Sequence, residues 1–403
     1  MKLRDLLSIS AVFIYVITLG YANEQNDNEI FIDELMQDYD DNGTDVPGAS
    51  VLIMCRNTPV VRRTYGFASI ENQTRVVSAT NFRLASVTKQ FTAAAILLLA
   101  EKKDGVFRLD DRIREKWLSS LPEVTAEITV RHLLTHTSGL IDYEDVNATD
   151  DDPDQQLSDA DVLKILSTQN RTYFTPPGSQ YRYSNSGYAL LALIVERASG
   201  KRFADFLHEY IFEPLQMTGT VAYEKGISTV DHRAFGHSYN GSAWILTDQG
   251  RTSAVLGDGG IYSSIDDLAR WDTALYDDRL LSYESLNLAF TPAVRTDDPG
   301  TQYGMGWEIS GDMIWHSGQS IGFRNIILRF PKQRLTVVIL TNRYVPSPYQ
   351  AALTIAHRFF FDGRCSTGCS GTNLIVCSKA LIAFWILVDL FFLRYRPLHW
   401  PIF

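Results

Sequence analysis

Cysteine is scarce in this chain, which limits what can hold the fold together. The 403 residues contain 4 cysteines. Cys55 stands alone in an apolar run, whereas Cys365, Cys369 and Cys377 lie close together near the end. Small scaffolds built from disulfides are dense in cysteine, so that class is excluded. We expect no disulfide framework in the main domain, although Cys365 and Cys369 could close one small loop.

Positive charge is also in short supply. The chain has 37 Lys and Arg against 47 Asp and Glu, a formal net charge of -10. Nucleic acid is therefore excluded as a partner, because binding phosphates requires a basic face. With 45% hydrophobic and 21% charged residues, the chain has the composition of a folded globular protein. We expect its partner to be a small-molecule or peptide substrate.

Long apolar runs are confined to the two ends. Lys2 and Arg4 precede an apolar run over 6–19, and the small residue Ala22 suits signal peptidase. We predict a signal peptide over 1–22 and a secreted or extracytoplasmic protein; the alternative is an uncleaved anchor, for which the run is short. Five Asn-X-Ser/Thr sequons fit a secretory route and a glycoprotein: Asn42, Asn72, Asn147, Asn170 and Asn240.

A C-terminal tail over 363–403 holds the second apolar run. Its segment 374–393 has about the length of a bilayer span. Lys379 and Asp389 oppose insertion, since each charge costs up to about 3 kcal/mol in the middle of a membrane. Membrane association through this segment and an amphipathic tail therefore both stay open.

Between these ends, strand patterns bracket a helical middle. Strands are expected at 46–54, 59–66, 306–309, 313–316, 323–330 and 335–341. Helices are expected at 87–102, 128–134, 159–166, 186–199, 203–211, 265–275 and 348–361. This order predicts one discontinuous α/β domain over 30–362, with a helical insertion.

Two patterns are compatible with metals, and neither is complete. The acidic loop 144–154 lacks the Gly and terminal Glu of an EF-hand, so we interpret it as a solvated surface loop. His132 and His136 have the i, i+4 spacing of a zinc site, but no Glu stands between them to act as a base. We assign no metal and no cofactor.

The segment RLASVTKQ places Ser86 where a helix N-cap or first-turn residue would stand. Lys89 follows three residues later on the same helical face. A serine hydroxyl needs a base to become nucleophilic, and a desolvated neutral lysine amine one turn away can serve. Ser-X-X-Lys alone is a weak signal, because capped helices with an exposed lysine share it.

Two further motifs strengthen the signal from Ser86 and Lys89. Tyr183 and Asn185 follow a turn-rich Pro-Pro-Gly and precede a helical pattern. Tyrosine can shuttle a proton, and asparagine can bind a substrate amide. His316 and Gly318 stand at the end of a strand pattern, where glycine would let a substrate backbone lie beside an edge strand.

With these motifs, the sequence resembles the superfamily of serine β-lactamases, D-alanyl-D-alanine carboxypeptidases and esterases. It is most similar to the class C and penicillin-binding-protein-like branch. The resemblance covers about 30–362 and includes LLTHTSGL, GDGGIYSSIDDLARW and YGMGW. It implies a β-lactamase/transpeptidase-like fold, with an antiparallel sheet flanked by helices and an inserted helical subdomain.

The resemblance also implies roles. Ser86 would form the acyl-enzyme, with Lys89 and Tyr183 as the proton-transfer pair. The N–H groups of Ser86 and Gln319 would form the oxyanion hole. Asn185 would hold a substrate amide, and His316 would face the leaving side. Many β-lactamases and carboxypeptidases carry lysine where this chain has His316. Histidine carries a full charge only part of the time near neutral pH, so it would hold a substrate carboxylate less firmly. An ester or amide substrate is therefore as compatible with this motif as a β-lactam or D-amino-acid peptide.

Two other interpretations are open. GQSIG over 318–322 matches the nucleophile elbow of α/β-hydrolases, with Ser320 as nucleophile, but a strand pattern follows it where a helix is needed. The other is a catalytically inactive homologue that binds a peptide or has a structural role. Because all three motifs are intact, we predict an enzyme.

Overall fold

One antiparallel sheet organises the molecule in the computed structural model, which describes residues 27–40, 45–102, 105–146, 154–361 and 365. Its eight strands run in the order β10-β11-β12-β13-β14-β15-β1-β2. They are β1 (Ala49–Cys55), β2 (Thr58–Tyr65), β10 (Val294–Arg295), β11 (Gln302–Tyr303), β12 (Glu308–Ser310), β13 (Met313–Ser320), β14 (Phe323–Phe330) and β15 (Leu335–Thr341).

The first and last strands of the domain pair within this sheet, beside its edge strand β2. β1 lies antiparallel to β15, with Ala49 opposite Thr341 and Cys55 opposite Leu335. Every residue of β1, β14 and β15 is buried. Both faces of the sheet are therefore covered, which explains why these strands read as nearly continuous apolar runs.

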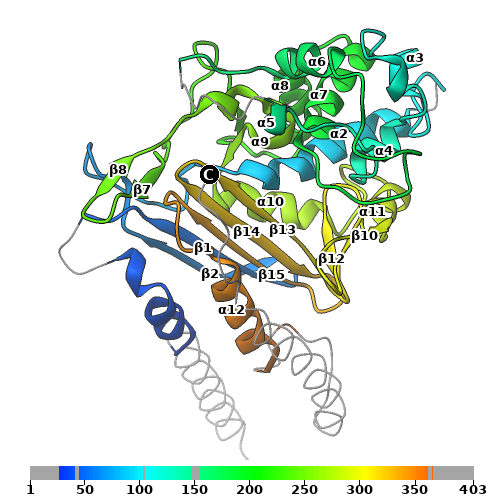
Figure 1. The fold of residues 1–403 in the computed structure, drawn as a ribbon. Helices are drawn as coiled ribbons and strands as arrows, with labels where there is room; N and C mark the ends of the chain where they lie inside the picture. Colours follow the sequence, from blue (N-terminus) through cyan, green and yellow to red (C-terminus); the bar gives the residue numbers. More distant parts are fainter. Residues whose placement is uncertain (1–26, 41–44, 103–104, 147–153, 362–364, 366–403) are drawn as a thin grey trace, which may run out of the picture.

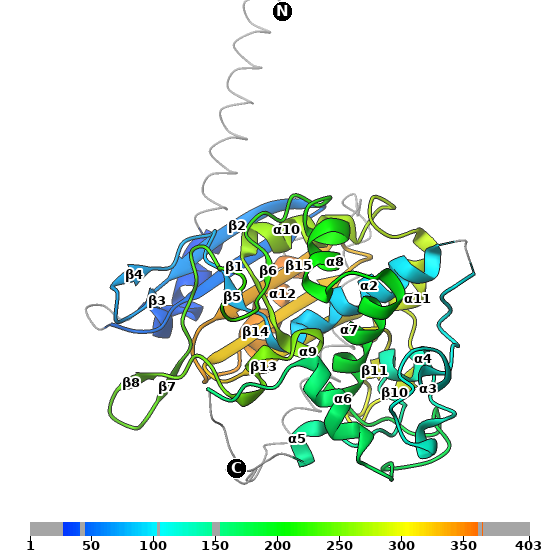
Figure 2. The same cartoon turned by 90° about the horizontal axis from the view of Figure 1, so that it is seen from above.

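Helices cover one face of the sheet (Figures 1 and 2). They are α2 (Lys89–Glu101), α3 (Ile113–Lys116), α4 (Val130–Leu134), α5 (Tyr143–Val146), α6 (Asp159–Ser167), α7 (Asn185–Ser199), α8 (Phe203–Leu207), α9 (Leu256–Gly259), α10 (Ile265–Ala274) and α11 (Tyr283–Ala289). Short turns of helix are η1 (Gln37–Tyr39), η2 (Ala85–Thr88), η3 (Glu123–Thr125), η4 (His208–Phe212) and η5 (Arg251–Ala254).

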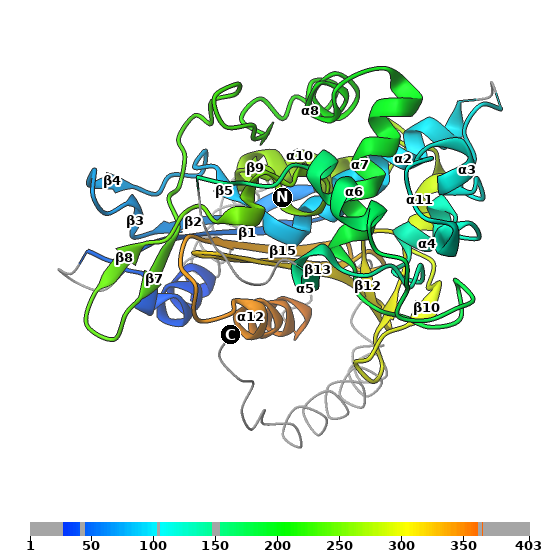
Figure 3. The same ribbon diagram turned by 45° about the horizontal axis from the view of Figure 1, so that its top comes forward.

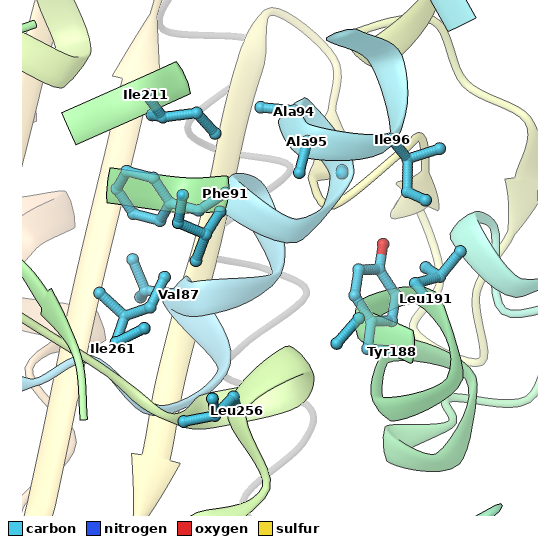
Figure 4. Packing of buried hydrophobic residues seen from close by; sticks show 14 of the residues in the cluster. Val87, Phe91, Ala94, Ala95, Ile96, Tyr188, Leu191, Ile211, Leu256 and Ile261 are labelled. Atoms are coloured by element: carbon cyan, nitrogen blue, oxygen red, sulfur yellow. The ribbon is translucent and has the colours of Figure 1, made fainter. Parts of the chain in front are cut away.

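Short strands complete this side: β3 (Phe67–Ser69), β4 (Thr74–Arg75), β5 (Phe82–Arg83), β6 (Val221–Ala222), β7 (His237–Tyr239), β8 (Trp244–Leu246) and β9 (Ile261–Ser263). The larger apolar core lies between the sheet and the helices. Figure 4 shows Val87 and Phe91 on one side of α2 and Tyr188 and Leu191 of α7 on the other. The helix that follows Ser86 is thus surrounded by core residues and held in a fixed position.

The opposite face of the sheet is covered by α12 (Tyr349–Phe361) and by the helix over 27–35 (Figure 3). A second apolar cluster fills this interface. It contains Cys55 and Cys365, which form a disulfide with a Cα–Cα distance of 5.2 Å. The sequence predicted no disulfide framework in the main domain and allowed a small Cys365–Cys369 loop. The structure instead has a disulfide that ties the main domain and joins Cys365 to Cys55, which stands alone in the sequence, because α12 returns the chain to the end of β1.

The expected fold class is confirmed, with small shifts at element ends. Helix α2 begins at Lys89, and Ser86 lies in the preceding 3-10 turn η2. Helix α8 ends at Leu207 and continues as a π-helical turn. β13 extends beyond His316 to Ser320.

The signal peptide over 1–22 and the apolar segment over 374–393 lie outside the described residues. Within the part that the structure describes, no helix combines the length and apolarity needed to span a bilayer.

Candidate active site

The predicted nucleophile sits on a tightly held turn between β5 and α2. Ser86 is partly exposed, whereas its neighbours Ala85 and Val87 are buried. The N–H of Leu84 donates to the Ile261 carbonyl at 2.8 Å, which fixes the approach to the turn. Ala85 has φ +51°, a conformation that costs a non-glycine residue about 1–3 kcal/mol. The surrounding core holds this turn in place, and Ser86 remains partly exposed.

Lys89 lies fully buried directly behind Ser86. Its Nζ is 3.0 Å from Ser86 Oγ, 2.8 Å from Asn185 Oδ1 and 2.9 Å from the backbone oxygen of Asp258. Burial lowers the pKa of Lys89 to about 8, with Asp258 opposing the shift. The amine therefore loses its proton far more readily than an exposed lysine does, which a general base requires.

Tyr183 lies beside Lys89. The centroid of its ring is 4.9 Å from Lys89 Nζ. Burial raises the pKa of Tyr183 well above its usual value, and a hydrogen bond with Ser86 opposes this only in part. Tyr183 is consequently a neutral phenol, suited to relay or donate a proton rather than to act as a phenolate base.

Asn185 begins helix α7 and is held from both sides. Its N–H donates to Asp142 Oδ2 at 2.7 Å, and its Oδ1 accepts from Lys89. Ser184 Oγ accepts from the N–H of Gly187 at 3.0 Å and caps the helix. The side chain predicted to bind a substrate amide thus has its oxygen engaged by Lys89.

His316 is buried beneath the site. Its Nδ1 is 2.7 Å from the backbone oxygen of Ser317, and its Nε2 is 3.1 Å from the hydroxyl of Tyr303. A carbonyl only accepts, so Nδ1 carries the proton and Nε2 accepts from Tyr303. Burial lowers the pKa of His316 to about 3. The part-time positive charge expected of this residue from the sequence is therefore absent near neutral pH.

Gly318 permits a close approach between β13 and the nucleophile turn. A Cβ on Gly318 would lie 2.1 Å from the carbonyl oxygen of Leu84. The position faces the chain leading to Ser86, whereas the sequence had suggested that its role was to make room for substrate. β12 pairs only with 313–315. Among the described residues, the later part of β13 therefore has no hydrogen-bonded strand on that side. Gln319, on this open stretch, is exposed.

The alternative motifs are used structurally. Ser320 ends β13 and is paired with Phe323, so GQSIG comprises the end of β13 and a two-residue hairpin turn, Ile321 and Gly322, with Gly322 at φ +69°. The Nδ1 of His132 accepts the N–H of Thr129, and that of His136 accepts the N–H of Ser184. Across the described residues, no group of three metal-ligating side chains is present.

Sequence reasoning missed several residues that hold the site. Asp142 binds the start of α7, and Tyr143 donates from its hydroxyl to Asp258 Oδ2 at 2.9 Å. His136 supports Ser184, as described above. His136 and Asp258 lie within the family-like stretches LLTHTSGL and GDGG, but only the fold shows that these stretches meet behind Lys89.

Comparisons with known proteins match the chain to a family. The family model described as Beta-lactamase matches residues 31–359. Penicillin-binding protein 4* of Bacillus subtilis (strain 168) is 32% identical over 316 residues, which are 74% of this chain and 69% of that protein. Protein flp of Staphylococcus aureus (strain MW2) is 26% identical over 334 residues, and the match spans 80% of this chain and 65% of that protein.

Solved structures of similar fold include a penicillin-binding protein and a hydrolase. A penicillin binding protein from Bacillus halodurans has a TM-score of 0.70 at 26% identity, covering 81% of this chain and 100% of that chain. EstCE1, described as a hydrolase with promiscuous acyltransferase activity, has a TM-score of 0.69 at 20% identity and covers 83% of this chain and 98% of its own. The second likeness concerns the fold alone.

Proposed function

The chain belongs to the β-lactamase family, and from that premise we propose that it is a serine hydrolase working through a covalent acyl-enzyme at Ser86. One observation carries the proposal: the buried Lys89 Nζ lies 3.0 Å from Ser86 Oγ. A base at this distance can take the hydroxyl proton as the oxygen attacks.

Acylation begins with attack by Ser86 and ends with departure of the leaving group. Ser86 Oγ forms a bond to the substrate acyl carbon while its proton moves to Lys89 Nζ. The bond to the leaving group breaks, and that group departs with a proton relayed through Tyr183, whose ring lies 4.9 Å from Lys89 Nζ. Water then attacks the ester, passes a proton to the same pair and releases the acid with Ser86 restored. The N–H groups of Ser86 and Gln319 stabilise the oxyanion.

The substrate we favour is an ester or amide whose recognition does not depend on a carboxylate. The neutral, buried His316 supports this choice, because its Nε2 accepts from Tyr303 and its Nδ1–H is engaged by Ser317. It therefore offers a carboxylate neither charge nor a free proton. A β-lactam or D-amino-acid peptide is the second substrate class, supported by the name of the Bacillus subtilis relative.

Intact-mass spectrometry of the full chain tests the proposal. The protein is incubated separately with an activated ester and with a penicillin, and the modified peptide is mapped. We expect an acyl increment on Ser86, faster with the ester, and no increment on a folded Ser86→Ala variant. A catalytically inactive homologue would give no adduct on Ser86 with either reagent, which would overturn the proposal.

A further inference from the structure

Asp258 lies directly behind Lys89 in helix α9. Its backbone oxygen accepts from Lys89 Nζ at 2.9 Å. Its side chain is buried, and Oδ2 accepts from the Tyr143 hydroxyl at 2.9 Å. The carboxylate of Asp159 accepts the N–H groups of Leu256 and Gly257, both at 3.0 Å. α9 is thereby fixed, with the Asp258 carbonyl in contact with the lysine and the carboxylate of the same residue buried and held by Tyr143.

The direct contacts of Lys89 leave a charge on its amine uncompensated. Its three acceptors are a hydroxyl, a side-chain amide oxygen and a backbone carbonyl, all of them uncharged. A buried ammonium is costly unless an opposite charge lies near. When Lys89 takes the proton of Ser86, that cost arises during the chemical step itself.

Several groups around Lys89 could contribute to this compensation. Asp258 is its strongest electrostatic partner, followed by Glu144 and then Asp142. The carboxylate of Asp142 is occupied, since it accepts the N–H groups of Asn185, Ser186 and Glu144.

Glu144 is an exposed residue on the short helix α5, although burial of its carboxyl raises its pKa to about 7, and its effect on Lys89 is smaller than that of Asp258. His136 and His316 also face the lysine and are neutral, because burial and the nearby Lys89 lower the pKa of each. Tyr183 and Tyr188 present ring faces at 4.9 and 5.5 Å. Asp258 is consequently the buried carboxylate with the fewest competing hydrogen bonds among these groups.

We propose that Asp258 is a positioning residue that stabilises the Lys89 ammonium formed during acylation, so that the two act as a base and its counterion. This inference rests on the proposed function of Ser86 and Lys89. It assigns to the GDGG segment a part in proton chemistry that the three sequence motifs do not include. Asp258 touches neither the substrate nor the serine and works through the lysine.

The titration behaviour of the pair agrees with this assignment. Burial raises the pKa of Asp258 to about 7, and the charge of Lys89 opposes the rise. Burial lowers the pKa of Lys89 to about 8, and Asp258 opposes that shift. Each group therefore stabilises the charged form of the other. Removing the carboxylate lowers the pKa of Lys89, giving more free amine at neutral pH but a weaker base.

The test is Asp258→Asn in the full chain, because the amide oxygen can still accept from Tyr143. Lysine labelled with ¹³C at Cε is titrated by NMR, with Lys89 assigned through Lys89→Arg. We expect the Lys89 midpoint to fall by about one pH unit. Single-turnover acylation of Ser86 is followed over the same pH range. The acid limb of the acylation pH profile should shift to lower pH by the same amount as the Lys89 midpoint. The plateau rate of acylation should fall by about tenfold.

Asp159→Asn is the matched control, since it removes a buried carboxylate that holds α9 but is absent from the electrostatic partners of Lys89. It should lower the melting temperature. The charge of Asp159 raises the pKa of Asp258, so its removal lets Asp258 ionise more readily, and the Lys89 midpoint should stay in place or rise slightly but not fall. Tyr143→Phe is a second variant, should Asp258→Asn fail to fold. Without the hydroxyl, the Asp258 carboxylate is less stable, so the Lys89 midpoint should fall in the same direction by a smaller amount.

An unchanged Lys89 midpoint in the folded Asp258→Asn or Tyr143→Phe variant overturns the inference, whatever the acylation rate. So does a midpoint shift in Asp159→Asn as large as that in Asp258→Asn. Failure of the proposed function is distinguishable, because it would leave Ser86 of the wild-type protein unmodified at every pH while Lys89 still titrates.

Discussion

At the scale of single residues, Gly318 leaves almost no room for a larger side chain. A Cβ there would lie 2.1 Å from the carbonyl oxygen of Leu84, closer than real contacts allow. Gly318→Ala must therefore push β13 away from the turn that carries Ser86. We expect a loss of about 1–3 kcal/mol in the free energy of unfolding and a large fall in the rate of Ser86 acylation. Denaturant unfolding and intact-mass kinetics measure the two effects.

Gly259 provides the control, because it also lies beside the nucleophile turn. A Cβ on Gly259 would meet Ala85 at 3.6 Å, an ordinary contact. Gly259→Ala should change the free energy of unfolding by less than about 0.5 kcal/mol. If Gly318→Ala were tolerated equally well, the close packing of β13 on this turn would not be needed to hold Ser86 in position.

Sequence reasoning at this scale worked where local spacing decides the contact. Ser86 and Lys89 are three residues apart, and a helical path brings residues at that spacing together. It did not work for His316, whose state depends on burial and on the Tyr303 hydroxyl. Burial is a property of the packed sheet, so the charge of His316 could not be deduced from its identity.

At the scale of elements, the site depends on how the start of α7 is held. His136 Nδ1 accepts the N–H of Ser184 at 3.0 Å, and Asp142 accepts the N–H of Asn185 at 2.7 Å. The ring of His136 also lies 4.3 Å, centroid to centroid, from that of Tyr183. These contacts place Tyr183 and Asn185 beside the lysine, so α7 acts as a rigid support for both.

Two substitutions at His136 separate its role as an acceptor from its bulk. His136→Leu leaves the buried N–H of Ser184 unpaired, at a cost of about 1–3 kcal/mol. We expect slower acylation of Ser86 by about tenfold or more. His136→Asn keeps an acceptor and tolerates the φ of +57° found here, so it should recover much of the loss. Equal effects of both variants on melting temperature and acylation would contradict this role.

The periodicity of the sequence was a good guide to the regular elements. Expected helices over 159–166 and 186–199 correspond to α6 and α7 within a residue. Short elements were missed: α9 has four residues, too few for a helical period to show. Asp258 lies in that helix, which is why its position behind Lys89 emerges only from the assembled fold.

At the scale of the whole molecule, the order of strands, helices and strands was enough to predict a discontinuous domain. β1 pairs with β15 because the chain returns to its beginning, and seven residue pairs join them. The same return brings Cys365 beside Cys55, a pair separated by 310 residues in sequence. The short spacing of the cysteines near the end had suggested a local loop instead. Spacing in the sequence does not show which distant segments the folded sheet brings together.

The Cys55–Cys365 disulfide should stabilise the fold without serving the chemistry. It belongs to the apolar cluster on the face of the sheet that packs against α12, whereas Val87, next to Ser86, belongs to the cluster on the other face. Cys55→Ser should lower the free energy of unfolding by about 2–4 kcal/mol, with acylation of Ser86 unchanged below the melting temperature. Cys369→Ser should change neither property. Thermal unfolding with and without reductant, together with peptide mapping under non-reducing conditions, measures this; a linked peptide joining Cys365 to Cys369 would contradict it.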